Sequence, residues 1–129
     1  MQDHKELIED AQRQTGLNDF GPDSFREGLE ILSDSLRREA RLNTVGERAL
    51  TERIGLHLRQ RLLIEDWYRR HPEIEDEQIV APLFGVSLPR TGSSALSYLL
   101  ASDPGIRYLR VWESAQPCPP VSYTHLRAH

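Results

Sequence analysis

Hydrophobic residues before position 79 recur every three or four residues, as on one face of an α-helix. A short run of Leu7, Ile8 and Ala11 stops at Gly16, which is typical of a helix C-terminus. Two longer stripes follow, each opened by an S/T-x-x-E capping box. They are Phe25, Leu29, Leu32, Leu36 and Ala40 after Ser24 and Glu27, then Leu50, Ile54, Leu58 and Leu62, reaching towards Trp67, after Thr44 and Glu47. The spacing predicts three amphipathic helices, the last ending before His71-Pro72.

From residue 79 the spacing changes to a nearly continuous hydrophobic run. Residues 79–88 are rich in β-branched and aromatic side chains and are bounded by Pro89, as expected of a strand buried on both faces. The predicted order is a strand over 79–88, a glycine-containing loop, a helix over 95–101, a turn at Asp103-Pro104-Gly105 and a second strand over 107–112. This order makes one βαβ unit.

The two patterns predict an α/β protein with a helical N-terminal region over 1–78 and the start of an α/β domain over 79–120. The tail over 121–129 continues neither pattern, and one back-translation of it reproduces a common sequencing-adapter sequence. We expect this tail to derive from the adapter and the native gene to continue beyond Pro120, so that the α/β domain is truncated.

Composition narrows the class of protein. The 129 residues suffice for one small domain or part of a larger one, and a net charge of −4 argues against a nucleic-acid or anionic-membrane binder. The single Cys118 can form neither an internal disulfide nor a cysteine-based zinc site. The charged N-terminus is unlike a signal peptide, and no apolar run reaches the roughly 18 residues of a membrane span. We expect a cytoplasmic protein without a metal site.

The loop between the first predicted strand and its helix carries the candidate chemistry. A helix N-terminus presents backbone N–H groups and the positive end of the helix dipole, and both favour phosphate. Gly92 permits close approach of an anion to the backbone, and Arg90 adds a permanently charged, planar guanidinium. The hydroxyls of Thr91, Ser93 and Ser94 can donate further hydrogen bonds.

A Walker A loop is excluded at two diagnostic positions. With Gly92 as its second glycine, that motif needs glycine at 87 and lysine at 93, whereas the chain has Ser87 and Ser93. The cation comes instead from within the loop, two positions before Gly92.

This arrangement resembles the bacterial sulfotransferases that use 3′-phosphoadenosine-5′-phosphosulfate (PAPS), whose loop is similar to L-P-R-T-G-[ST]-[ST]. The similarity extends over roughly residues 7–120. The matching segments are 88–94, 99–104, 110–113 and 117–120, and upstream 15–21, 41–43 and 71–74. The resemblance implies a P-loop-like, parallel-sheet fold.

The resemblance also implies roles for individual residues. Arg90, Thr91, Gly92, Ser93 and Ser94 would hold the 5′-phosphosulfate, with Arg90 stabilising charge on the oxygen between phosphate and sulfate. Glu113 follows the second predicted strand, about where related sulfotransferases have an acidic or His residue that is proposed as the base taking the acceptor's proton. Ser87 departs from the glycine that relatives often have, and the segments that bind the 3′-phosphate and adenine in the family are absent.

The function expected from the resemblance is transfer of a sulfuryl group from PAPS to a hydroxyl or amine of a small-molecule acceptor, with Arg90 and Glu113 as the catalytic residues. The chain as written is expected to be inactive, because residues 79–120 are too few to build a covered sheet. Two alternatives stay open: a P-loop-like nucleotide kinase, and a non-enzymatic helical module whose apolar stripes pack on a partner protein. The sequence indicates neither the acceptor nor the oligomeric state.

Overall fold

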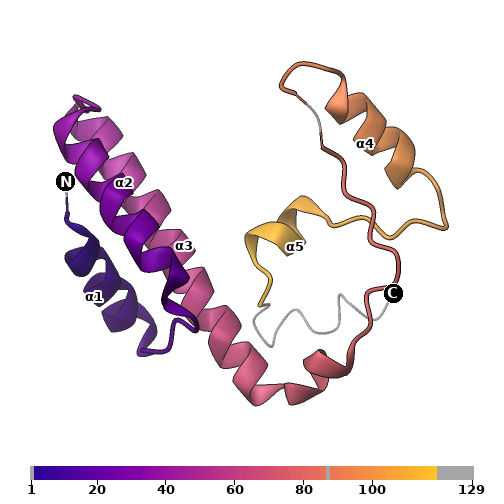
Figure 1. Cartoon of the computed structure of the whole chain (residues 1–129), viewed down its shortest axis with the longest axis horizontal. Coiled ribbons are helices and arrows are strands. Elements are labelled where there is room, and N and C mark those ends of the chain that lie inside the picture. Colours follow the sequence, from indigo (N-terminus) through magenta and orange to yellow (C-terminus); the bar gives the residue numbers. More distant parts are fainter. Residues whose placement is uncertain (1, 87, 119–129) are drawn as a thin grey trace. The chain divides into compact units, whose positions relative to one another are not determined.

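The computed structural model describes residues 2–86 and 88–118, which divide into two compact units (Figure 1). One unit comprises the residues up to Pro72 together with Cys118, and the other comprises Glu73–Pro117. The predicted boundary at residue 78 stays a prediction, and both Ser87 and the tail lie outside the described residues. In chain order the elements are α1 (His4–Thr15), the 3₁₀ helix η1 (Asp23–Phe25), α2 (Arg26–Arg38), α3 (Thr44–Arg70), the 3₁₀ helix η2 (Pro72–Asp76), α4 (Ser93–Ala101) and α5 (Val111–Ala115).

The first helix, α1, is capped at both ends. Asp3 accepts hydrogen bonds from the backbone N–H groups of Lys5 at 2.8 Å and Glu6 at 2.9 Å, and Glu6 reaches back to the Asp3 N–H at 3.0 Å. The bond from the Glu6 N–H is the main cause that lowers the pKa of Asp3. At the other end Gly16 adopts a left-handed φ of 71°, which confirms the predicted terminus. This D-x-x-E capping box was not predicted, although the spacing of Asp3 and Glu6 is visible in the sequence.

The predicted starts of the next two helices are wrong in detail. Ser24 does not cap α2, because η1 precedes the helix and the N–H of Arg26 bonds to the carbonyl of Asp23. The cap of α3 is Asn43, whose side chain accepts from the Gly46 N–H at 2.8 Å, so Thr44 is the first helical residue. The extent of α3, up to the residue before His71-Pro72, agrees with the hydrophobic spacing.

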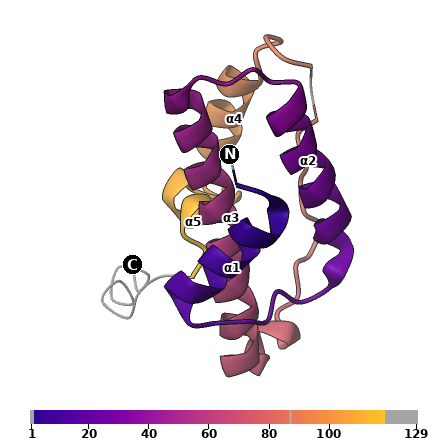
Figure 2. The same ribbon diagram turned by 90° about the vertical axis from the view of Figure 1, so that its left-hand side faces the viewer.

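The core of the first unit lies where α1 packs along α3 and, to a smaller extent, against α2 (Figures 1 and 2). Its buried hydrophobic residues are Leu7, Ala11, Phe20, Leu29, Leu58 and Leu62. The predicted stripe of α2 is only partly buried, because Leu32 is 45% exposed whereas Ser33 is 1% exposed. A small polar residue therefore occupies a position in the interior.

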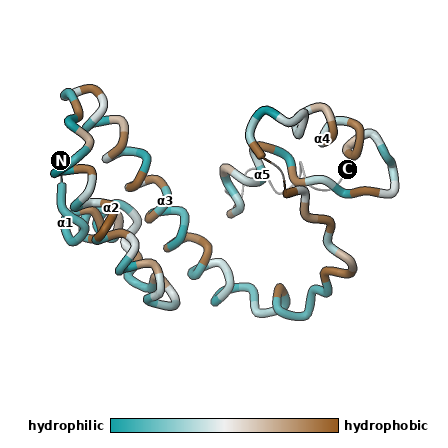
Figure 3. Tube along the Cα trace, turned by 45° about the horizontal axis from the view of Figure 1, so that its top comes forward, coloured by the Kyte–Doolittle hydropathy of each residue, from teal (hydrophilic) through white to brown (hydrophobic). Residues whose placement is uncertain are grey.

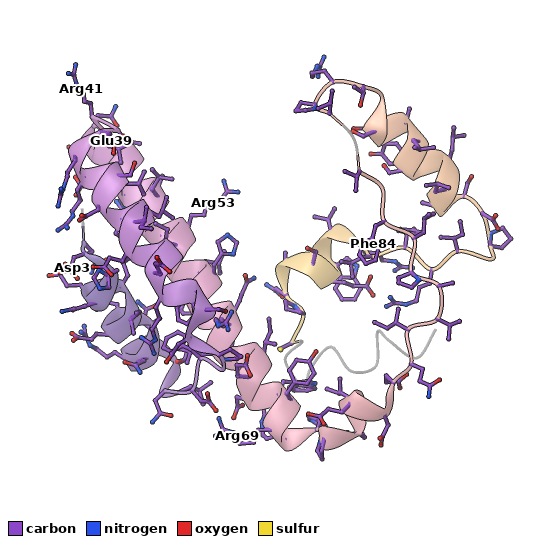
Figure 4. All side chains as sticks on the ribbon, in the orientation of Figure 1. Asp3, Glu39, Arg41, Arg53, Arg69 and Phe84 are labelled. Atoms are coloured by element: carbon purple, nitrogen blue, oxygen red, sulfur yellow. The ribbon has the colours of Figure 1, made fainter. Side chains whose placement is uncertain are left out.

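Arg61 of α3 holds the loop between α1 and α2 in place. Its guanidinium donates to the backbone carbonyls of Phe20 at 2.6 Å and Pro22 at 3.0 Å, and lies 4.6 Å from the ring centroid of Phe25. Arg69, also on α3, pairs with Asp19 of the same loop at 2.8 Å (Figure 4). One face of α3 thus binds both the helix α1 and the loop that follows it.

The second unit does not contain the predicted βαβ unit, since no strand is present in residues 73–86 and 88–117. Residues 77–86 are irregular because a strand needs neighbours that pair with its N–H and C=O groups, and none is present in the described segments. The second predicted strand, 107–112, overlaps α5, which begins at Val111. The helix predicted over 95–101 is confirmed as part of α4, and the Asp103 turn by the bond from the Ile106 N–H to the Asp103 carbonyl at 3.1 Å.

Most hydrophobic side chains of the second unit face solvent. The run before α4, brown in Figure 3, includes Ile79 at 82%, Phe84 at 80% and Val86 at 95% exposure. On α4 itself Leu99 is 71% exposed. The hydrophobic residues of the second unit are therefore not buried in a core of their own, unlike those of the first unit.

We predict that Ser33→Ala stabilises the chain by about 1 kcal/mol. The Ser33 hydroxyl is buried without a hydrogen-bond partner among the described residues, and removing it relieves a desolvation penalty of that order. Thermal unfolding followed by circular dichroism measures the change. Ser35→Ala on the same helix is the control for helix propensity, and an equal gain from both variants would show that the Ser33 hydroxyl is satisfied.

We predict that Gly21→Ala destabilises the chain more than Gly16→Ala. Both glycines have a left-handed φ, 66° and 71°, which costs a non-glycine residue roughly 1–2 kcal/mol. A Cβ at Gly21 would also overlap the carboxylate of Glu65, so this flexible side chain has to rotate away at a small extra cost, whereas a Cβ at Gly16 meets nothing within 4 Å. The difference in unfolding free energy should shrink in a Glu65→Ala background, and an unchanged difference would exclude the overlap as its cause.

Candidate functional site

The candidate loop lies directly before α4. Gly92 is the N-cap of this helix with a left-handed φ of 86°, and its carbonyl accepts the first helical hydrogen bond, from the Leu96 N–H at 3.1 Å. No side chain caps the helix start. The N–H groups of Ser93, Ser94 and Ala95 precede that first bond, so the helix itself provides no acceptor for them. This end of α4 therefore offers several backbone donors and the positive end of its dipole.

The residues before Gly92 form a turn closed by a side chain. Pro89 and Arg90 lie in the turn, Arg90 has a φ of 66°, and the Thr91 hydroxyl donates to the Leu88 carbonyl at 2.6 Å. Arg90 is exposed, as are the other residues of the loop. The cation predicted from the sequence is thus exposed, and its residue lies two positions before the N-cap of α4.

The donor set fits a phosphate or sulfate group. Backbone N–H groups and serine hydroxyls donate hydrogen bonds, and guanidinium pairs with two oxygens of one tetrahedral anion. A Cβ at residue 92 would meet nothing within 4 Å, so Gly92 is required by its φ and not by crowding from protein atoms. The side of the loop at Gly92 is consequently open.

Glu113 is held within its own segment. One carboxylate oxygen accepts from the Arg110 N–H at 2.8 Å, which caps the start of α5, and the other lies 3.2 Å from the Arg107 guanidinium. The Glu113 side chain is 15% exposed and that of Arg107 is 80% exposed. Arg107 was not predicted as a partner of Glu113, because an arginine six positions before an acidic residue forms no recognisable sequence motif.

The five loop residues are contiguous, but the structure does not bring Glu113 to them. Helices α4 and α5, both in the second unit, do not pack against each other. The catalytic assignments of Arg90 and Glu113 and the binding assignments of the loop therefore stay predictions.

The described part of the chain contains neither a metal-binding cluster nor a membrane-spanning helix. No group of three or more His, Cys, Asp or Glu side chains is arranged to hold a metal ion among these residues. No helix among them is both long enough and apolar enough to cross a membrane.

Two solved structures of sulfotransferases are similar to the chain. Sulfotransferase STF1 from Mycobacterium tuberculosis is 35% identical with a TM-score of 0.82, over 92% of this chain and 34% of that protein. Sulfotransferase STF9 from Mycobacterium avium is 31% identical with a TM-score of 0.85, over 99% of this chain and 33% of that protein. No family model matches, and no curated protein sequence is significantly similar.

These similarities confirm the resemblance to bacterial sulfotransferases, and the use of PAPS stays a prediction. The chain is related to the bacterial sulfotransferases in sequence and in fold, and it spans about a third of the length of the two solved structures.

Proposed function

We propose that the chain is the part of a bacterial sulfotransferase that binds the 5′-phosphosulfate of PAPS, with the Arg90–Ser94 loop as the binding element. The observation that carries this proposal is that no side chain caps the start of α4 at Gly92, and that the exposed Arg90 precedes Gly92 by two residues. Similarity to two sulfotransferases over at least 92% of the chain supports it. The acceptor would be a small molecule with a hydroxyl or an amine.

Arg90 and the helix start would act on charge that develops during transfer. When bound, PAPS supplies the sulfuryl group: the bond from sulfur to the phosphate oxygen breaks and a bond from sulfur to the acceptor forms. Negative charge then builds up on the departing phosphate. A fixed cation and backbone N–H groups directed at that charge lower the barrier without reorganising.

Glu113 would take the proton that the acceptor loses. Its carboxylate oxygens each keep a lone pair beyond the bonds from Arg110 and Arg107, so the existing hydrogen bonds orient the group and still allow it to accept a proton. In this proposal the cap of α5 and the base are the same side chain.

We predict that Arg90→Ala lowers kcat about 10²- to 10³-fold in a chain extended to the length of the solved relatives. The loss should fall on kcat more than on binding of PAPS, because the departing phosphate carries more negative charge in the transition state than in bound PAPS. Arg90→Lys should retain much of the activity, since it preserves the charge. Steady-state kinetics and calorimetric binding measure the two quantities.

Arg53→Ala is the matched control for that experiment. Arg53 is an exposed arginine on α3, outside the loop, and its loss should change neither quantity (Figure 4). Competition between adenosine 3′,5′-bisphosphate and ATP distinguishes a sulfotransferase from a nucleotide kinase. Near-normal turnover by Arg90→Ala, or preference for ATP, would overturn the proposed function.

We predict that Glu113→Gln in the same extended chain slows transfer to an aliphatic alcohol more than to a phenol. A glutamine oxygen can still accept from the Arg110 N–H, so the cap of α5 is preserved while the base is lost. A phenol ionises more readily and depends less on a base. Equal losses with both acceptors would indicate that Glu113 has only its structural role.

A further inference from the structure

The loop contains an arginine where the backbone favours glycine. Leu88, Pro89, Arg90 and Thr91 occupy the four positions of a turn whose third residue, Arg90, has a φ of 66°. Proline at the second position and a positive φ at the third are typical of a type II turn, in which glycine or asparagine is preferred at the third position. The Arg90 backbone is therefore in a conformation that other parts of the loop have to stabilise.

Two neighbours provide that stabilisation. The ring of Pro89 restricts φ at the second position of the turn, which directly precedes Arg90. The Thr91 hydroxyl donates to the Leu88 carbonyl at 2.6 Å and so joins the two ends of the turn by a side-chain bond. Arg90 lies between these two restraints.

That bond limits what Thr91 can do for a ligand. A hydroxyl has one hydrogen to donate, and in Thr91 this hydrogen is directed to Leu88. The oxygen that remains is an acceptor, which an anion does not attract. The Thr91 hydroxyl therefore cannot donate to a phosphosulfate oxygen while the turn keeps this geometry.

We propose that Thr91 is a positioning residue, which holds Arg90 in the left-handed conformation and so directs its guanidinium beside the start of α4. This inference rests on the proposed function of the loop and changes the expected role of Thr91 from ligand to restraint. Contact with the anion then falls to Arg90, to the backbone N–H groups that begin α4, and to Ser93 and Ser94.

A double-mutant cycle distinguishes restraint of Arg90 by Thr91 from direct binding of the anion by Thr91. The variants are Thr91→Val and Arg90→Gly, alone and together, in the 129-residue chain. Glycine adopts a positive φ without strain, so the restraint from Thr91 becomes unnecessary once Arg90 is replaced. If Thr91 instead donated directly to the anion, Thr91→Val would lower the affinity for the anion equally in the wild-type and Arg90→Gly backgrounds.

The readouts are backbone NMR signals of residues 88–93 without ligand, and the affinity for inorganic pyrophosphate as a small probe. Thr91→Val should shift the signals of Arg90 in the free chain and weaken pyrophosphate binding about threefold to tenfold, as expected for one lost hydrogen bond. In the Arg90→Gly background, the same change should alter neither the signals of residue 90 nor the affinity. Thr91→Ser should restore wild-type behaviour.

The opposite end of α4 provides a matched control. The Ser102 hydroxyl donates to the Leu99 carbonyl at 2.7 Å, which is the same kind of bond over the same sequence separation. Ser102→Ala should leave the signals of Arg90 and pyrophosphate binding unchanged.

Unshifted Arg90 signals in Thr91→Val, together with equal losses of affinity in both backgrounds, would overturn the positioning role and identify Thr91 as a ligand. Absence of pyrophosphate binding to the wild-type chain would instead count against the proposed function of the loop. The NMR signals of the free chain still decide the role of Thr91 in that case.

Discussion

Packing of α1 against α3 is the interaction on which the first unit depends. A helix of 12 residues is marginal on its own in water, so α1 needs the surface of α3 to persist. Leu7 of α1 and Leu62 of α3 are 2% and 0% exposed, and each buried leucine contributes about 1.5–3 kcal/mol. The loop after α1 is then held on the same helix, because Arg61 binds its carbonyls and stacks on Phe25.

The second unit is organised by local hydrogen bonds instead of a core. Its hydrophobic run before α4 is exposed, and no strand neighbours are present for it in the described residues. The regular elements of this unit are stabilised by hydrogen bonds between residues close in sequence. They are α4, which begins after Gly92, the Asp103 turn, and α5, which is capped by Glu113. The chain spans about a third of the length of its two solved relatives, and a parallel sheet requires pairing between distant segments.

The candidate site belongs to this locally stabilised part, which explains why its geometry is defined although residues 2–86 and 88–118 contain no sheet. A proline, a side-chain bond and two positive φ angles occur within five consecutive residues, 88–92. They fix the backbone of Arg90 two residues before a helix start whose first N–H groups have no acceptor within the helix. Such preorganisation is what electrostatic stabilisation of a developing phosphate charge requires.

Spacing and turn residues along the chain were enough to predict α1, α2, α3 and α4 and the loop before α4, but not α5. The three-to-four spacing of Leu50, Ile54, Leu58 and Leu62 predicted α3, Gly16 marked the end of α1, and the residues around Gly92 indicated an anion site and a family. These features depend on backbone preferences and periodicity within one segment, which a sequence displays directly.

Which residues are buried and which backbone groups are paired became known from the folded structure alone. It placed Ser33 inside in preference to Leu32, assigned the cap of α3 to Asn43, and left residues 77–86 without the pairing that would make a strand. It also engaged the hydroxyl of Thr91 with Leu88 and the carboxylate of Glu113 with Arg107 and Arg110. Burial and pairing depend on which neighbours reach a residue in space, and spacing along one segment does not contain that information.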